Sequence, residues 1–241
     1  MCDMDLICGQ LSARGRRKAL NAKNNKVRNR SLTAEFLLWH VLTRETDMLA
    51  STFQDSRNIW GLSDIPELDE GEEGKPYLRD YPDVSFSLSH SGDYVLCAVS
   101  EDCVGADIQK KEPLKADIAS RFYSDAERKL IACSEDSLTA FYHIWVLKES
   151  YVKYTGKGLS EGLDSFSVYQ IDGVNGGKPC FSLDAGHNQD GKLRLSIYDM
   201  DEYAIGVCHK GNIVERPSLV DIRVITDKIN LLSRSDQGGS L

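Results

Sequence analysis

The sequence predicts an α+β protein that is built from two similar halves. A strand–turn–strand pattern occurs twice with one internal spacing, from Phe86 through Asp93-Tyr-Val-Leu and from Leu195 through Glu202-Tyr-Ala-Ile, although chance could also produce this match. Helical patterns occupy the segments before and between these strands. The 241 residues are enough for one large domain or two small ones. A cleft between two similar halves is a common place for a ligand.

The first half is predicted to begin with a helix and to continue with three strands. The helix runs from Ser31 to Met48, with Ser31 and Thr33 as possible caps. Residues 61–83 are rich in glycine, proline and acid, and are predicted as a loop. The predicted strands run from Val84 to Ser89, from Tyr94 to Val99 and from Val104 to Ile108.

The second half is predicted to contain three helices and three strands. The helices run from Lys115 to Phe122, from Ser124 to Cys133 and from Leu138 to Thr155. Ser124 and Glu127 have the spacing of a capping box, and Gly156 stops the last helix. The strands run from Phe166 to Ile171, from Leu193 to Tyr198 and from Tyr203 to Cys208. We therefore predict an N-terminal lobe over residues 1–105, a C-terminal lobe over 106–215, and a partly disordered tail over 216–241.

Composition points to a soluble, cytoplasmic protein. The chain is 41% hydrophobic and 27% charged, and no apolar run approaches the roughly 20 residues that span a bilayer. The acidic start, Met-Cys-Asp-Met-Asp, is unlike a secretory signal. The seven cysteines are scattered and show no zinc-binding spacing, which favours a reducing compartment.

The charge is unevenly distributed. The net charge of −8 argues against a general nucleic-acid binder, yet eight basic residues and no acid lie between Arg14 and Arg30. A basic patch on an acidic protein suits a small polyanionic ligand, while a solvated helix face is the alternative. The acidic run from Asp64 to Glu73 is predicted to be a solvated loop.

The segment from Trp145 to Leu159 carries the strongest functional signal. Trp145, Glu149 and Lys153 are spaced four apart and would share one face of a helix. Alone, Glu149 and Lys153 would be read as an ordinary surface pair. A second carboxylate, Asp107, follows an apolar strand, where a capping role is the alternative. Two further segments complete the set: Gly74-Lys75-Pro76 and Ser89-His90.

Together these segments resemble the 4′-phosphopantetheinyl transferases of the surfactin-synthetase-activating type. The family pattern is G-x-D-x-E followed by W-x-x-K-E-x-x-x-K, which appears here as Gly105-Ala-Asp107-Ile-Gln109 and as Trp145 through Lys148-Glu149 to Lys153. The resemblance extends over residues 15–210. It implies the phosphopantetheinyl transferase fold, a pseudo-dimer of two α+β lobes with the active site in the cleft between them. We expect Trp145 to pack between the lobes rather than to touch substrate, and we expect a monomer.

The resemblance implies transfer of phosphopantetheine from coenzyme A to a serine of an apo peptidyl or acyl carrier protein. Such carriers serve nonribosomal peptide and polyketide synthesis, including antibiotic biosynthesis. Asp107 and Glu149 would bind Mg²⁺, and Gln109 stands where the family often has a third, acidic ligand. Either Gln109 coordinates weakly or a water fills that position. Glu149 would take the serine proton, directly or through a water. Lys153 would stabilise phosphoryl charge or protonate the leaving oxygen.

The resemblance also implies contacts with coenzyme A. The residues concerned are Lys18, Arg30, Ser31, Lys75, Ser89, His90, Lys148 and Lys153. His90 on its own would be read as a structural histidine. No nucleic acid or membrane is expected as a partner.

Three alternatives stay open at this point. Leu114, Ile118 and Phe122 form an apolar stripe that would either pack on its own lobe or line a groove for a carrier helix, next to Lys110, Lys111 and Lys115. A magnesium-dependent hydrolase of coenzyme A-like diphosphates would use the same carboxylates without a protein partner. A nucleic-acid-binding module would use the basic run but would leave Asp107 and Glu149 without a role.

Overall fold

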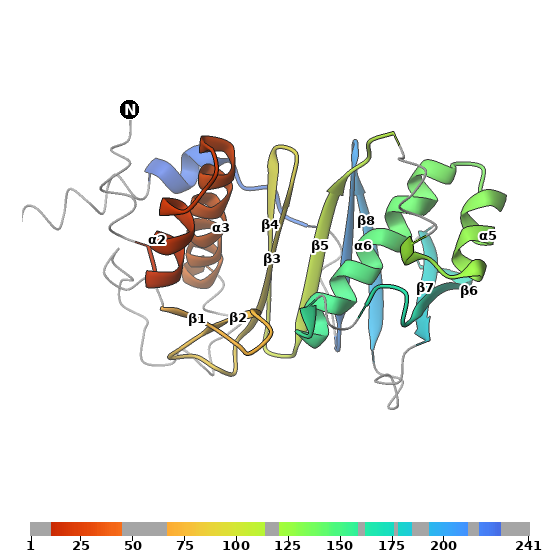
Figure 1. Ribbon diagram of the computed structural model, residues 1–241, viewed down its shortest axis with the longest axis horizontal. Coiled ribbons are helices and arrows are strands. Elements are labelled where there is room, and N and C mark those ends of the chain that lie inside the picture. The colour runs from red at the N-terminus through yellow and green to blue at the C-terminus, as the bar shows by residue number, and fades with distance from the viewer. Residues whose placement is uncertain are drawn as a thin grey trace, which may run out of the picture. The chain divides into compact units, whose positions relative to one another are not determined.

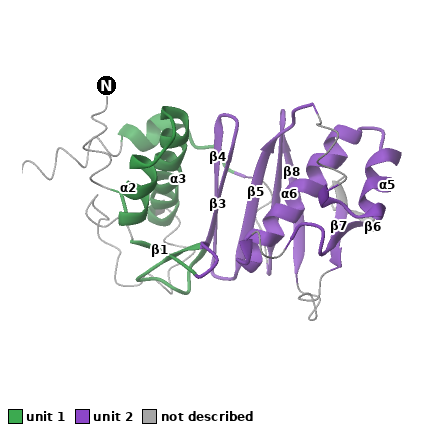
Figure 2. Cartoon of the chain, in the orientation of Figure 1, with its two compact units in different colours: residues 1–71, 76–85, 218–241 green, residues 72–75, 86–217 purple. Residues whose placement is uncertain are grey.

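The computed structural model describes residues 11–44, 67–113, 121–158, 162–175, 178–184, 193–211 and 217–227 (Figure 1). The chain divides into two compact units, coloured in Figure 2. The first comprises residues 1–71, 76–85 and 218–241, and the second comprises 72–75 and 86–217. The predicted lobe boundary at residue 105 lies inside the second unit. None of the helices in the described ranges is long and apolar enough to cross a membrane.

The first unit contains a pair of helices, α2 (Ala13–Leu20) and α3 (Asn25–Arg44). Ser12 caps α2 by accepting a hydrogen bond from the Gly15 amide, and it donates its own amide and hydroxyl to Glu35 of α3. A Cβ atom on Gly15 would lie 2.1 Å from Glu35 Oε2, so this glycine allows the two helices to approach closely. The helix α2 was not among the predicted elements, although Ser12 is a typical cap.

The helix α3 begins earlier than predicted. The Asn24 side chain accepts from the Val27 amide at 3.0 Å and supplies the cap. Ser31 therefore lies inside the helix, where its hydroxyl donates to the Val27 carbonyl, and its predicted capping role was wrong. The predicted end at Met48 lies outside the described residues.

Two short strands and a helical segment complete the described part of the first unit. The strands β1 (Leu68–Glu70) and β2 (Pro76–Leu78) pair antiparallel within the predicted loop. Glu70 accepts from Arg14 at 2.7 Å and ties β1 to α2. Residues 222–227 are helical, within the segment where the sequence signal fades.

The second unit is built on a five-stranded antiparallel sheet of order β5-β9-β8-β7-β6. Its strands are β5 (Val104–Lys110), β6 (Ser167–Asn175), β7 (Lys178–Asp184), β8 (Arg194–Met200) and β9 (Tyr203–His209). The strand β7 was not predicted. A separate hairpin is formed by β3 (Ser85–Ser91) and β4 (Tyr94–Ser100).

Two helices of the second unit confirm the sequence prediction. The helix α5 (Asp125–Cys133) begins with the predicted capping box of Ser124 and Glu127. The helix α6 (Ser137–Thr155) ends at Gly156, whose φ of 73° is the left-handed conformation of a helix C-terminus. The two helices share a core with β6 to β9, which includes Phe141, Ile144, Val168 and Ile197. The predicted helix from Lys115 lies outside the described residues up to residue 120.

The predicted repeat forms two hairpins of one plan, β3–β4 and β8–β9. Each turns at a residue with positive φ: Gly92 at 53° and Asp201 at 50°. The hairpins touch, because Tyr94 and Tyr203 make an edge-on ring contact at 4.8 Å. The Tyr203 hydroxyl also accepts from the Asp93 amide.

The helix α6 lies unusually close to the sheet, which positions the site. A Cβ atom on Gly105 of β5 would lie 2.0 Å from the Ser150 carbonyl oxygen, and one on Gly206 of β9 would lie 2.5 Å from the Val146 carbonyl oxygen. Only glycine fits at such contacts with helix backbone. Asp107 pairs with Gly206 across the sheet and lies on the same face of β5 as Gly105, so its side chain is directed towards α6.

Candidate active site

Asp107 is the centre of the candidate site. It is buried, with 2% of its surface exposed. Its Oδ1 atom accepts from the Ser89 hydroxyl and from Lys153 Nζ, both at 2.6 Å. Its Oδ2 atom accepts from Gln109 Nε2 at 3.1 Å. Three donors thus hold a carboxylate that would otherwise be costly to bury.

Glu149 and Lys153 approach Asp107 from successive turns of α6. Burial raises the pKa of Glu149, the nearby Asp107 carboxylate raises it further, and the Lys153 ammonium opposes both effects. The predicted stripe of Glu149 and Lys153 and the strand-borne Asp107 therefore come together. Trp145, which we expected between the lobes, packs inside the second unit against Phe141 and the aromatic pair Phe122 and Tyr123.

The chemistry of this site suits a hard divalent cation. Two partly or fully buried carboxylates repel one another, and Mg²⁺ typically takes one or two carboxylates together with phosphate oxygens and water. The described residues hold no cluster of three or more histidine, cysteine, aspartate and glutamate side chains. Asp107 and Glu149 would therefore be the negatively charged protein ligands of a cation at this site.

Gln109 supports the carboxylate of Asp107. Its amide nitrogen donates to Asp107 Oδ2, and its carbonyl oxygen accepts from the Ser91 hydroxyl at 3.4 Å. In this arrangement the oxygen that would be needed for a metal is turned towards Ser91. The expectation that Gln109 is at most a weak ligand stays a prediction.

Lys148 does not join the cluster around Asp107. Its ammonium is fully buried and donates to both oxygens of Glu127, at 2.7 and 2.9 Å, and to the Phe166 carbonyl at 2.7 Å. Glu127 is equally buried and also accepts from the amides of Ser124 and Val168. All three ammonium protons are used inside the core, so the structure gives Lys148 no route to coenzyme A.

Lys75, Ser89 and His90 occupy three different places. Lys75 Nζ donates to the carbonyls of Tyr154, at 3.2 Å, and Val104, at 3.3 Å, and so caps the end of α6. Ser89 is buried against Asp107, whereas His90 is exposed. Of these three predicted coenzyme A contacts, only Ser89 is brought to the carboxylate cluster.

The predicted phosphate contacts Lys18 and Ser31 meet in the first unit. They line a hollow of about 350 Å³ between the ends of α2 and α3, together with Arg17, Asn21, Ala22, Lys23 and Val27. The lining residues include three cations and no acid. Burial lowers the pKa of Lys18, as does the nearby Arg14 guanidinium. Arg30 lies beside Ser31 on α3 but does not line the hollow.

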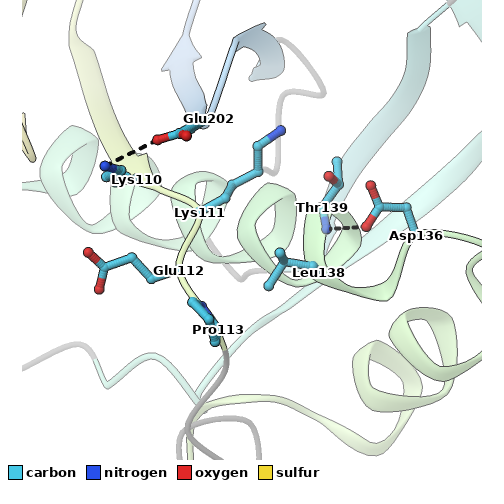
Figure 3. A pocket seen from close by; sticks show the side chains of 8 residues that line it. All are labelled: Lys110, Lys111, Glu112, Pro113, Asp136, Leu138, Thr139 and Glu202. Atoms are coloured by element: carbon cyan, nitrogen blue, oxygen red, sulfur yellow. Dashed lines mark hydrogen bonds and ion pairs between the residues drawn. The ribbon is translucent and has the colours of Figure 1, made fainter.

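A second hollow of about 650 Å³ lies in the second unit, beyond the end of β5 (Figure 3). Lys110 and Lys111 of the strand end line it, with Leu138 and Thr139 from the start of α6. Lys110 pairs with Glu202 at 3.1 Å. The predicted docking residues Leu114 and Ile118 lie outside the described residues.

Sequence reasoning missed two features of these sites. Arg17 and Lys23 line the basic hollow beside Lys18, and only the helix pairing reveals which members of the basic run face it. The hydrogen bond from Ser89 to Asp107 was also missed, because no local pattern links residues on two unpaired strands.

Comparison with known proteins identifies the family. Residues 103–208 match the 4′-phosphopantetheinyl transferase superfamily. The chain is 33% identical over 168 residues to the Bacillus subtilis 4′-phosphopantetheinyl transferase ffp, and this match covers 69% of each chain. The chain belongs to the 4′-phosphopantetheinyl transferases.

Two further transferases of this family extend the comparison. A 4′-phosphopantetheinyl transferase of Bacillus subtilis is 42% identical over 147 residues, which cover 57% of this chain and 60% of that protein. The 4′-phosphopantetheinyl transferase Sfp of strain 168 is 37% identical over 160 residues, which cover 66% of each chain. The matches to these two relatives thus span less than two thirds of their length. Of the polar residues in the family pattern, the fold brings together Asp107, Gln109, Glu149 and Lys153.

Proposed function

We propose that this 4′-phosphopantetheinyl transferase moves the phosphopantetheine group of coenzyme A to a serine of an apo peptidyl or acyl carrier protein. The observation that carries the proposal is the convergence of Asp107, Glu149 and Lys153 in a partly buried site. Two carboxylates and a lysine meet the needs of phosphoryl transfer, which are positioning and neutralisation of charge.

The residues of this chain suggest how the step proceeds. The serine oxygen forms a bond to the β-phosphorus of coenzyme A, the bond to the bridging oxygen breaks, and 3′,5′-ADP leaves. Glu149, which lies close to Asp107 and Lys153, takes the serine proton directly or through a water. Lys153 stabilises the charge on the phosphoryl oxygens or gives a proton to the leaving oxygen.

Asp107 and Glu149 are the residues that would hold Mg²⁺. When bound, Mg²⁺ neutralises charge on the phosphate oxygens of the substrate. The fit rests on the donor set, because Asp107 is fixed by three donors and Glu149 lies close enough to feel its charge.

The basic hollow of the first unit supports binding of coenzyme A. Lys18, Arg17 and Lys23 offer positive charge to a ligand with a diphosphate and a 3′-phosphate. We also propose a carrier contact near Lys110 and Lys111, where the hollow of Figure 3 combines cations with apolar Leu138. Glu112, Asp136 and Glu202 also line this hollow, so the proposed contact rests on Leu138 and on the two lysines as individual donors, not on an excess of positive charge.

The decisive experiment incubates the protein with coenzyme A, Mg²⁺ and an apo carrier domain, and reads the intact mass of the carrier. Asp107→Ala and Glu149→Ala should stay folded and lose transfer, and EDTA should silence the wild type until Mg²⁺ is restored. Glu101→Ala, which removes an exposed carboxylate, serves as the matched control. Wild-type turnover in a folded Asp107→Ala or Glu149→Ala variant would exclude the assignment. Release of 3′,5′-ADP without a carrier would favour the hydrolase instead.

A second experiment tests the expected phosphate contacts. Lys75→Ala and His90→Ala are compared with coenzyme A and its 3′-dephospho form. Contacts that are made equally in the ground and transition states should raise KM more than they lower kcat. If either residue holds the 3′-phosphate, its variant should lose the preference for coenzyme A. An unchanged preference would fit the helix-capping role that the structure gives Lys75.

A further inference from the structure

Three serine hydroxyls on β3 accept hydrogen bonds from backbone amides of β5. They act where the backbone carbonyls of a paired strand would otherwise accept. The hydroxyl of Ser87 accepts from the Ala106 amide at 2.9 Å, that of Ser89 from the Ile108 amide at 3.4 Å, and that of Ser91 from the Lys110 amide at 2.9 Å. β3 and β5 belong to different sheets, so these side chains meet the amides that point away from β9. The alternation of strand side chains places every second residue of β3 on this side. We call this set the hydroxyl ladder.

The three serines differ in where they send their own proton. Ser87 donates to a backbone carbonyl, that of Ala106, at 3.3 Å, and Ser91 donates to the neutral Gln109 side chain. Ser89 alone donates to a carboxylate, and its 2.6 Å bond to Asp107 Oδ1 has the short length of a charge-assisted hydrogen bond. Ser89 is itself 8% exposed, so this bond is shielded from water.

The hydrogen bond of Ser89 helps to determine which oxygen of the Asp107 carboxylate can accept a further ligand. A carboxylate has about four acceptor sites, two on each oxygen. Ser89 and Lys153 fill Oδ1, and among the described residues only Gln109 donates to Oδ2. The one remaining acceptor site is therefore on Oδ2, and rotation of the carboxylate would break the bonds to Ser89 and Lys153.

We infer that Ser89 is a positioning residue that acts through Asp107, by fixing the rotation of its carboxylate so that Oδ2 is offered to the metal. This inference rests on the proposed function, because it takes Asp107 as a metal ligand. It differs from the expectation that Ser89 contacts coenzyme A, since it assigns the hydroxyl proton to Asp107.

The test compares Ser89→Ala with Ser87→Ala as the matched control. Both remove a buried hydroxyl from the hydroxyl ladder, but only Ser89→Ala frees Asp107. Mn²⁺ is titrated into each protein and the free ion is followed by electron paramagnetic resonance. Loss of a partner that orients a metal ligand typically weakens metal binding by about 10- to 100-fold, so Ser89→Ala should show that loss and Ser87→Ala should not. Ser89→Thr, which keeps the hydroxyl, should restore binding.

Two more readouts make the outcome unambiguous. Amide exchange should increase at Ile108 in Ser89→Ala and at Ala106 in Ser87→Ala, which verifies the hydroxyl ladder in folded protein. The preference of Ser89→Ala for coenzyme A over its 3′-dephospho form should equal that of the wild type. Equal Mn²⁺ affinity in the two alanine variants, or loss of the coenzyme A preference in Ser89→Ala, would overturn the inference. If the wild type binds Mn²⁺ but modifies no carrier, the proposed function fails while the Mn²⁺ comparison still decides the role of Ser89.

Discussion

Replacing Lys148 with methionine should damage the fold of the second unit. The ammonium of Lys148 has no exposed surface and makes three hydrogen bonds, two of them to the equally buried Glu127. Removing one partner of a buried ion pair typically costs about 3–5 kcal/mol, because the other charge stays behind unpaired. Glu127 keeps two amide donors, from Ser124 and Val168, so we expect the lower end, about 3 kcal/mol.

Urea unfolding measured by circular dichroism and by tryptophan fluorescence gives the free energy of unfolding. With a slope of about 2 kcal/mol per molar urea, the midpoint of Lys148→Met should fall by about 1.5 M. In a Glu127→Gln background the same substitution should cost only about 1 kcal/mol, because no buried charge is left unpaired. The coupling between the two positions should therefore be about 2 kcal/mol.

Lys153→Met on the next turn of α6 is the matched control. Lys153 is 28% exposed in its side chain, and Asp107 keeps Ser89 and Gln109 when the ammonium is lost. Because Lys153 is partly exposed and Lys148 is not, we expect a smaller stability loss than in Lys148→Met, together with loss of transfer. Equal stability of Lys148→Met and wild type, or no coupling with Glu127, would refute the structural role of Lys148.

Three further predictions concern the packing of α6, the buried acid of the first unit and the basic hollow. Gly105→Ala should lower the melting temperature and the rate of transfer, because its Cβ would meet the Ser150 carbonyl at 2.0 Å and such overpacking typically costs about 1–3 kcal/mol. Burial raises the pKa of Glu35, so the folded protein holds a proton more tightly than the unfolded chain and loses stability as pH rises through that raised pKa. The stability of Glu35→Gln relative to wild type should therefore increase as the pH is raised above the ordinary carboxyl pKa, as measured by urea titrations. Lys23→Ala should raise KM for coenzyme A with little change in kcat, whereas Lys129→Ala on α5 should not, and equal kinetics in both variants would remove the basic hollow from the binding site.

Sequence patterns predicted that Asp107, Glu149 and Lys153 would share a site, and two of the placements follow short-range rules. Glu149 and Lys153 lie one turn apart, and Asp107 lies on the face of β5 that carries Gly105. The expectation for Lys148 came from the family resemblance and not from its spacing. The helix α6 is buried on several sides, and the sequence does not identify the side that faces another helix. Its partner, Glu127, lies on α5, and only tertiary packing brings the two charges together.

Boundaries in the first unit were less accessible to sequence reasoning. The basic residues of α2 and of the start of α3 outnumber the apolar ones, so no apolar helical pattern is visible there. The predicted helix therefore began at Ser31, although Asn24 supplies the cap. The strand β7 escaped notice because it starts with Lys178 and Pro179, and proline is uncommon in strands. The repeated hairpins were recognisable because similar residues recur around the turn at equal spacing, and in the structure each turn has a residue with positive φ at the same point.

The hydroxyl ladder affects which fragments of this chain would stay monomeric when they are expressed alone. In hydrogen-bonding terms β5 is the last strand of its sheet, and an uncovered edge of this kind invites pairing with another chain. The serines of β3 occupy the amides that would otherwise recruit a neighbour. The stretch that matches the superfamily starts at residue 103, after β3 and β4. It therefore lacks the serines that cover the edge of β5. Expressed as a separate fragment, that stretch would expose β5 and self-associate along it. The hairpin before it therefore covers the strand edge along which that stretch would associate.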